Sequence, residues 1–107
     1  MICEEQLNGL AKVIGNKIVL SYINEFERES LAAIDNNIHL KCTKGSEEIW
    51  QLLHKLSGTA KTFGFLDFCE LAEDIQRNTE IYHDKLEELK SILKKNTNEA
   101  TFLLQYD

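Results

Sequence analysis

The chain has 107 residues, of which 43% are hydrophobic, and its formal net charge at pH 7 is −6. This length predicts a single domain, residues 1–107, that buries a core without needing disulfides or metals. The negative charge argues against nucleic acid as a partner, because its phosphates would be repelled. No apolar run approaches the roughly 18–20 residues of a membrane span, so no membrane association is expected.

The N-terminus and the cysteines indicate a cytoplasmic protein. Residues 1–5 lack the basic and apolar regions of a signal peptide. Cys3, Cys42 and Cys69 are odd in number and form no CxxC pair, which argues against a disulfide framework and against a zinc site. We therefore expect reduced thiols and a cytoplasmic monomer.

Helical periodicity begins near the N-terminus. The first predicted helix covers 4–14, with Gly15 as its stop and Asn16 as the N-cap of the next helix. The second predicted helix covers 17–37. Its expected inward positions are Val19, Tyr22, Ile23, Phe26, Ser30, Ala33 and Ile34.

The third predicted helix follows a polar loop at 41–45. Ser46 is the expected N-cap, and the helix reaches Phe63 before Gly64 ends or bends it. At about 100° per residue, one arc of this helix is apolar. The arc consists of Ile49, Leu52, Leu53, Leu56, Ala60 and Phe63.

Two more helices complete the predicted fold. The fourth covers 66–79, with Phe68, Leu71, Ala72 and Ile75 inward. Residues 84–87 have the spacing of a capping box for the fifth helix, with Asp84 as its cap, and 96–98 are expected to fray or kink it. Its inward positions are Leu86, Leu89, Leu93, Ala100 and Leu103. An all-α, up-and-down four-helix bundle with a short N-terminal helix over one end buries these stripes most simply.

One histidine stands out on the third predicted helix. His54 points away from the apolar arc, and its helical neighbours are Trp50, Gln51, Ser57, Gly58 and Lys61. Glycine within a helix costs roughly 1 kcal/mol relative to alanine, so something must favour the bare backbone of Gly58 beside the imidazole. Close approach of a macromolecular partner is a sufficient reason.

The segment around His54 resembles the histidine-containing phosphotransfer (HPt) family. His54, Leu56, Gly58, Ala60 and Gly64 match its core pattern. Residues 62–65 resemble the phosphorylated domain of chemotaxis histidine kinases. The resemblance implies a four-helix bundle with His54 as phosphoacceptor, which exchanges a phosphoryl group with a response-regulator receiver domain or a hybrid sensor histidine kinase.

The resemblance also suggests roles for residues around His54. Ser57 stands where most members carry a lysine that helps to hold the phosphoryl group, and Lys61, about 20° around the helix from His54, is a candidate substitute. Gln76 matches a glutamine that faces the phosphohistidine in some members. Gln51 is expected to orient the ring, and Trp50 to lie at the core edge or on the docking surface.

The expected chemistry needs no cofactor on this chain. A neutral imidazole is a good nucleophile near pH 7, and the receiver supplies both the aspartate and the Mg²⁺. The sequence contains no glycine-rich nucleotide loop and no metal-ligand motif. We therefore expect a phosphocarrier without an ATP site, not an autonomous kinase.

Two alternatives remain open at this point. Ser57 favours a degenerate HPt-like bundle that binds proteins without phosphotransfer. The second alternative is a domain excised from a larger chemotaxis-type kinase. Met1 and the tail 102–107 disfavour it. Acid-labile, base-stable phosphorylation from a cognate receiver separates phosphotransfer from simple binding.

Overall fold

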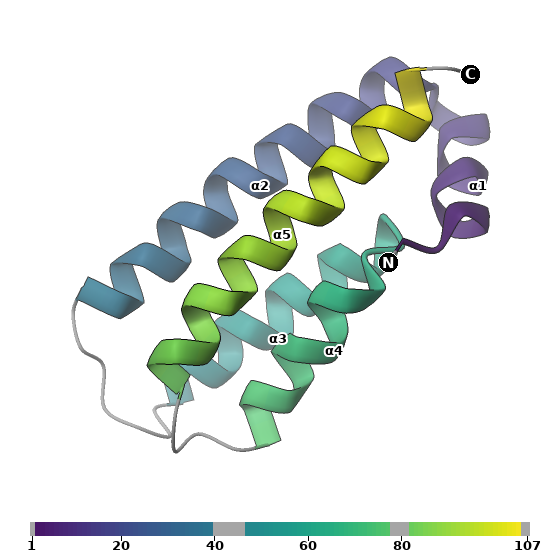
Figure 1. The fold of residues 1–107 in the computed structure, drawn as a ribbon. Helices are drawn as coiled ribbons and strands as arrows, with labels where there is room; N and C mark the ends of the chain where they lie inside the picture. The colour runs from purple at the N-terminus through teal and green to yellow at the C-terminus, as the bar shows by residue number, and fades with distance from the viewer. Residues whose placement is uncertain (1, 40–46, 78–81, 106–107) are drawn as a thin grey trace.

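The computed structural model describes residues 2–39, 47–77 and 82–105. Its helices are α1 (Glu4–Ile14), α2 (Asn16–His39), α3 (Glu47–Thr62), α4 (Leu66–Arg77) and α5 (Tyr82–Gln105). Successive helices from α2 to α5 run antiparallel along one long axis (Figure 1). The predicted all-α, up-and-down bundle is confirmed. The predicted loop at 41–45, the cap at Ser46 and the end of the fourth helix at 78–79 lie outside the described residues.

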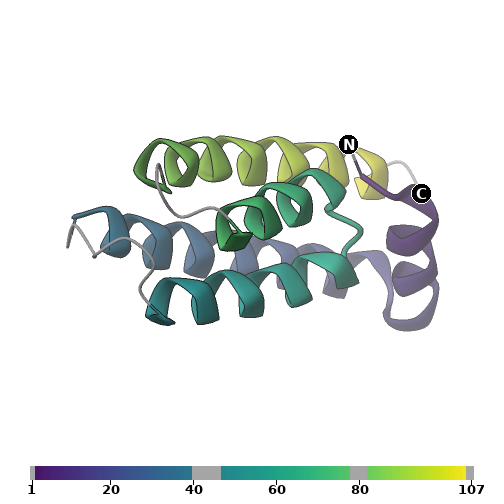
Figure 2. The same ribbon diagram turned by 90° about the horizontal axis from the view of Figure 1, so that it is seen from below.

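The bundle consists of two helix pairs with α1 across one end. α2 packs against α5 and α3 against α4, and α4 also packs against α5. Figure 2 shows α1 crossing the end of the bundle, where it contacts α2 and α3, as the sequence predicts. No helix in the described part of the chain is long and apolar enough to cross a membrane.

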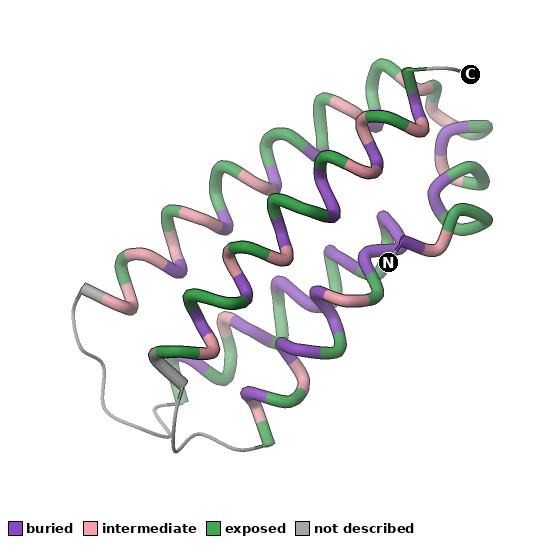
Figure 3. The backbone as a smooth tube through the Cα atoms, viewed as in Figure 1, coloured by how far each residue is buried: buried purple, intermediate pink, exposed green. Residues whose placement is uncertain are grey.

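Buried residues line the inner face of every helix (Figure 3). Near α1 the core is aromatic: the rings of Phe26, Phe63, Phe65 and Phe68 lie with centroids 5.7 to 6.4 Å apart in tilted or edge-on pairs. Such pairs contribute about 0.5–1.5 kcal/mol beyond the area that they bury. This cluster fixes the turn between α3 and α4, and with it the position of α3.

Two predicted helix starts are wrong, by one residue for α2 and by three residues for α5. Asn16 is the first residue of α2 rather than its N-cap, because Gly15 alone, at φ 91°, connects α1 to α2. The Asn16 side chain instead donates from Nδ2 to the carbonyl of Leu104 on α5, at 3.0 Å. α5 begins at Tyr82, so Asp84 lies within its first turn and is not the cap.

The predicted break at 96–98 is also wrong. α5 continues through this segment because tertiary contacts outweigh its weak helix propensity. Asn96 is fully buried, and its Oδ1 accepts a hydrogen bond from the backbone N–H of Phe68 at 3.4 Å. That N–H belongs to the first turn of α4, where no carbonyl of the helix itself can pair with it.

Tyr22 is predicted to point inward but is 52% exposed. The buried positions of α2, such as Val19, Phe26 and Ser30, cluster around one helical direction, and Tyr22 lies about 80° from it. Because α2 packs mainly on α5, the tyrosine lies at the rim between α2 and α3. Near the end of α5, Leu104 is buried, whereas Leu103, which is predicted to point inward, is only partly buried.

Candidate functional site

The candidate site lies on α3, which carries every predicted site residue except Gln76. Glu47 and Glu48 occupy its first turn, where carboxylates stabilise the positive end of the helix dipole. Gly64 ends the helix at φ 76°, and a Cβ there would lie 2.6 Å from the backbone oxygen of Cys3. The Gly64 carbonyl in turn accepts the Cys3 N–H at 2.7 Å, so the N-terminal segment holds the end of α3.

His54 is exposed at mid-helix, and the indole of Trp50 covers one face of its ring. The two rings are stacked, with centroids 5.0 Å apart and planes 12° apart. Gln51 is predicted to orient the imidazole, but its Nε2 donates to Oε1 of Glu47 at 3.3 Å. The aromatic side chain one turn before His54, rather than the amide, contacts the ring.

Gly58 lies one turn after His54 and is exposed. A Cβ built on Gly58 meets nothing within 4 Å. Packing among the described residues therefore gives no reason for a glycine here, although glycine costs roughly 1 kcal/mol relative to alanine. Along the helix, the imidazole therefore has the indole of Trp50 on its N-terminal side and the bare backbone of Gly58 on its C-terminal side.

Ser57 does not lie on the surface with His54, so its predicted place on the partner surface is wrong. The residue is 4% exposed and lies between α3 and α4, where it contacts Cys69. The Ser57 carbonyl accepts a hydrogen bond from Sγ of Cys69 on α4 at 3.4 Å. Burial raises the pKa of the Cys69 thiol, and an interaction with the side chain of Ser57, distinct from the bond to its carbonyl, offsets part of that rise. The thiol therefore serves as a neutral packing group.

Lys61 lies on the same face of α3 as His54, as predicted, but its charge is paired. Its Nζ lies 3.2 Å from Oε1 of Glu73 on α4. Both side chains are substantially exposed, at 63% and 41%, so the pair is worth at most about 1 kcal/mol. The spacing of residues on α3 alone does not identify Glu73 as the partner of Lys61.

Gln76, on α4, contacts α3 at Trp50, which is one turn before His54. Its Nε2 donates to the backbone carbonyl of Trp50 at 3.3 Å, so the amide binds the backbone of α3 rather than the imidazole. Gln76 and Trp50 lie equally far from Phe63 along the chain, as do Cys69 and Ser57. The symmetry of an antiparallel helix pair about its turn relates these two contacts, but it does not predict the pair of Lys61 and Glu73, which lie at unequal distances from Phe63 along the chain.

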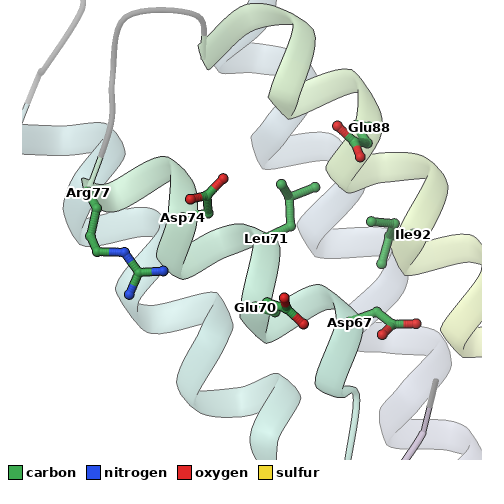
Figure 4. Close-up of a pocket in the computed structure, with 7 residues that line it drawn as sticks. All are labelled: Asp67, Glu70, Leu71, Asp74, Arg77, Glu88 and Ile92. Carbon is green, nitrogen blue, oxygen red and sulfur yellow. The ribbon is translucent and has the colours of Figure 1, made fainter.

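The other acidic residues of α4 face the groove between α4 and α5. Glu70 and Asp74 line a hollow of about 370 Å³ between α4 and α5, together with Asp67, Glu88 and Arg77. Figure 4 shows the carboxylates spread along its walls instead of converging on one point. Within 2–39, 47–77 and 82–105, no three His, Cys, Asp or Glu side chains are grouped to hold a metal ion.

No protein-family model, curated protein or solved structure matches this chain. The functional argument therefore depends on the residues of the site. They provide an exposed imidazole nucleophile, an open surface at Gly58 beside it, and an ammonium group at Lys61 on the same face. This arrangement suits transfer of an anionic group to and from a second macromolecule that brings the rest of the chemistry.

Proposed function

We propose that the chain is a histidine phosphotransfer protein of a two-component phosphorelay, with His54 as the phosphoacceptor. The observation that carries the proposal is the pairing of an exposed mid-helix imidazole with an exposed glycine one turn away that internal packing does not require. The match of His54, Leu56, Gly58, Ala60 and Gly64 to the HPt pattern supports the same function.

The proposed step is an exchange between two proteins. A ring nitrogen of His54 attacks the phosphorus of an aspartyl phosphate on a receiver domain; the N–P bond forms, the P–O bond breaks, and the aspartate leaves as carboxylate. The reverse step returns the phosphoryl group. The receiver brings the aspartate and its Mg²⁺, and this chain contributes the nucleophile and a surface that admits the partner.

The test is to map the phosphorylated residue. The protein is incubated at neutral pH with receiver domains from the source genome that have been phosphorylated with acetyl phosphate. We expect one acid-labile, base-stable phosphoryl group, which mass spectrometry under neutral conditions assigns to His54. Label that persists in His54→Gln contradicts the assignment.

The runner-up is a phosphorylation-independent binding module with an HPt-like fold. One observation favours it: the position that carries a lysine in most HPt proteins is a buried serine here, Ser57. A receiver that binds the wild-type chain and the His54→Gln variant equally tightly, and never labels the wild type, selects this alternative.

A further inference from the structure

The stack of Trp50 on His54 gives the imidazole two different sides along the helix axis. Side chains one turn apart lie on the same helix face, and each leans toward the N-terminus. His54 therefore leans over the turn that carries Trp50, where the indole covers one ring face. On the other side lies Gly58, with open space where a side chain would stand.

Trp50 has no evident structural need to be aromatic. It is 46% exposed, and core positions of α3 such as Leu53 and Leu56 provide the apolar burial. Its backbone carbonyl accepts the hydrogen bond from Gln76, which any residue at position 50 preserves. Among the described residues, the stack on His54 is the aromatic contact that a smaller apolar residue at position 50 would lose.

We propose that Trp50 is a positioning residue for His54: it holds the imidazole by stacking, so that the ring nitrogens face a partner arriving over Gly58. The inference rests on the proposed phosphotransfer function. A stacked aromatic pair favours its stacked state by a factor of about 2 to 12. Without the indole the ring samples other rotamers, and the fraction of reactive encounters falls by a similar factor.

The first experiment tests the stack itself and needs no phosphotransfer. Trp50 is the chain's only tryptophan, so its fluorescence reports on its neighbour. Because the imidazole covers one face of the indole, His54→Gln should expose that face and increase the collisional quenching of Trp50 emission by acrylamide at constant pH. Equal quenching in the wild type and in His54→Gln overturns the proposal.

The second experiment measures phosphorylation with two donors. Phosphoramidate is a small donor: the His54 nitrogen attacks phosphorus, the P–N bond breaks, and ammonia leaves. Trp50→Leu keeps an apolar side chain but loses the ring, and should be labelled about 2 to 12 times more slowly by both phosphoramidate and a phosphorylated receiver. Trp50→Phe keeps a ring that stacks and should recover most of the rate.

The outcomes separate this inference from the proposed function. Wild-type protein that neither donor labels at His54 overturns the proposed function and this inference with it. Wild-type labelling with an equal rate in Trp50→Leu overturns this inference alone. A loss confined to the receiver reaction makes Trp50 a docking contact and overturns the positioning role. A loss that is equal in the Leu and Phe variants shows that stacking is not its cause and overturns the positioning role as well.

Discussion

A side chain at Gly58 should stabilise the protein and still impair phosphotransfer. Gly58 lies inside α3 with open space around its missing Cβ, so Gly58→Leu introduces no internal clash and replaces a poor helix former with a good one. The expected gain approaches about 1 kcal/mol in the free energy of unfolding, which raises Tm by about 4–8 °C for a domain near 100 residues. Loss of stability therefore cannot explain slower phosphotransfer in Gly58→Leu.

Under the proposed function, we expect the loss to arise at the interface with the partner. If the receiver packs its surface over the bare backbone, a leucine side chain must be accommodated there, and overpacking of this kind costs about 1–3 kcal/mol. That cost corresponds to a fall of about 5- to 150-fold in kcat/KM for transfer from the receiver. Phosphoramidate needs no docking, so its rate of labelling His54 should stay unchanged in the same variant.

Gly9 offers a matched control. It is also an exposed glycine inside a helix, α1, with nothing within 4 Å of a built Cβ. Gly9→Leu should raise Tm by a similar amount and transfer at the wild-type rate. The reasoning is refuted by a folded, stabilised Gly58→Leu that accepts phosphoryl groups from the receiver as fast as wild type. Equal slowing of the phosphoramidate reaction refutes it too, because the leucine would then block the imidazole itself.

Three further predictions concern the surroundings of the site. Glu73→Gln releases Lys61 from its ion pair, which is worth about 0.2–1 kcal/mol, and should raise phosphohistidine accumulation about 1.4- to 5-fold at low salt. Lys61→Ala should lower phosphohistidine accumulation. Both effects should shrink in about 0.5 M salt. Gly64→Ala should lower the free energy of unfolding by about 1–3 kcal/mol, measured by urea titration, because of its positive φ and the contact with Cys3. The raised pKa of Cys69 means that the unfolded thiol ionises first, so stability should fall as pH rises from about 7 to 10; a Cys69→Ala protein with the same slope contradicts this.

The fold was predictable because its signals are local and repeated. Apolar residues at helical spacing gave the five helices, and Gly15 and Gly64 marked two of the junctions. The error at 96–98 has a long-range cause, because the bond between Asn96 and the backbone of Phe68 depends on how α4 meets α5. Propensity within the segment contains no information about that contact.

The face of α3 that carries His54 was also predictable, since position around a helix follows from sequence spacing alone. Trp50, Gly58 and Lys61 all share that face as expected, but their partners did not follow from the spacing. The contact between Lys61 and Glu73 requires the second helix of the pair. The stack on Trp50 requires side-chain rotamers.

Ser57 shows most clearly what spacing leaves undetermined. At about 100° per residue, Ser57 lies about 60° to one side of His54 and Gly58 about 40° to the other, so both seem equally close to the surface. α4 packs over the Ser57 side only, where Cys69 meets it, and leaves the Gly58 side open. The neighbouring helix therefore decides that position 57 is a packing site, and it leaves Gly58 as the open side from which a partner can approach His54.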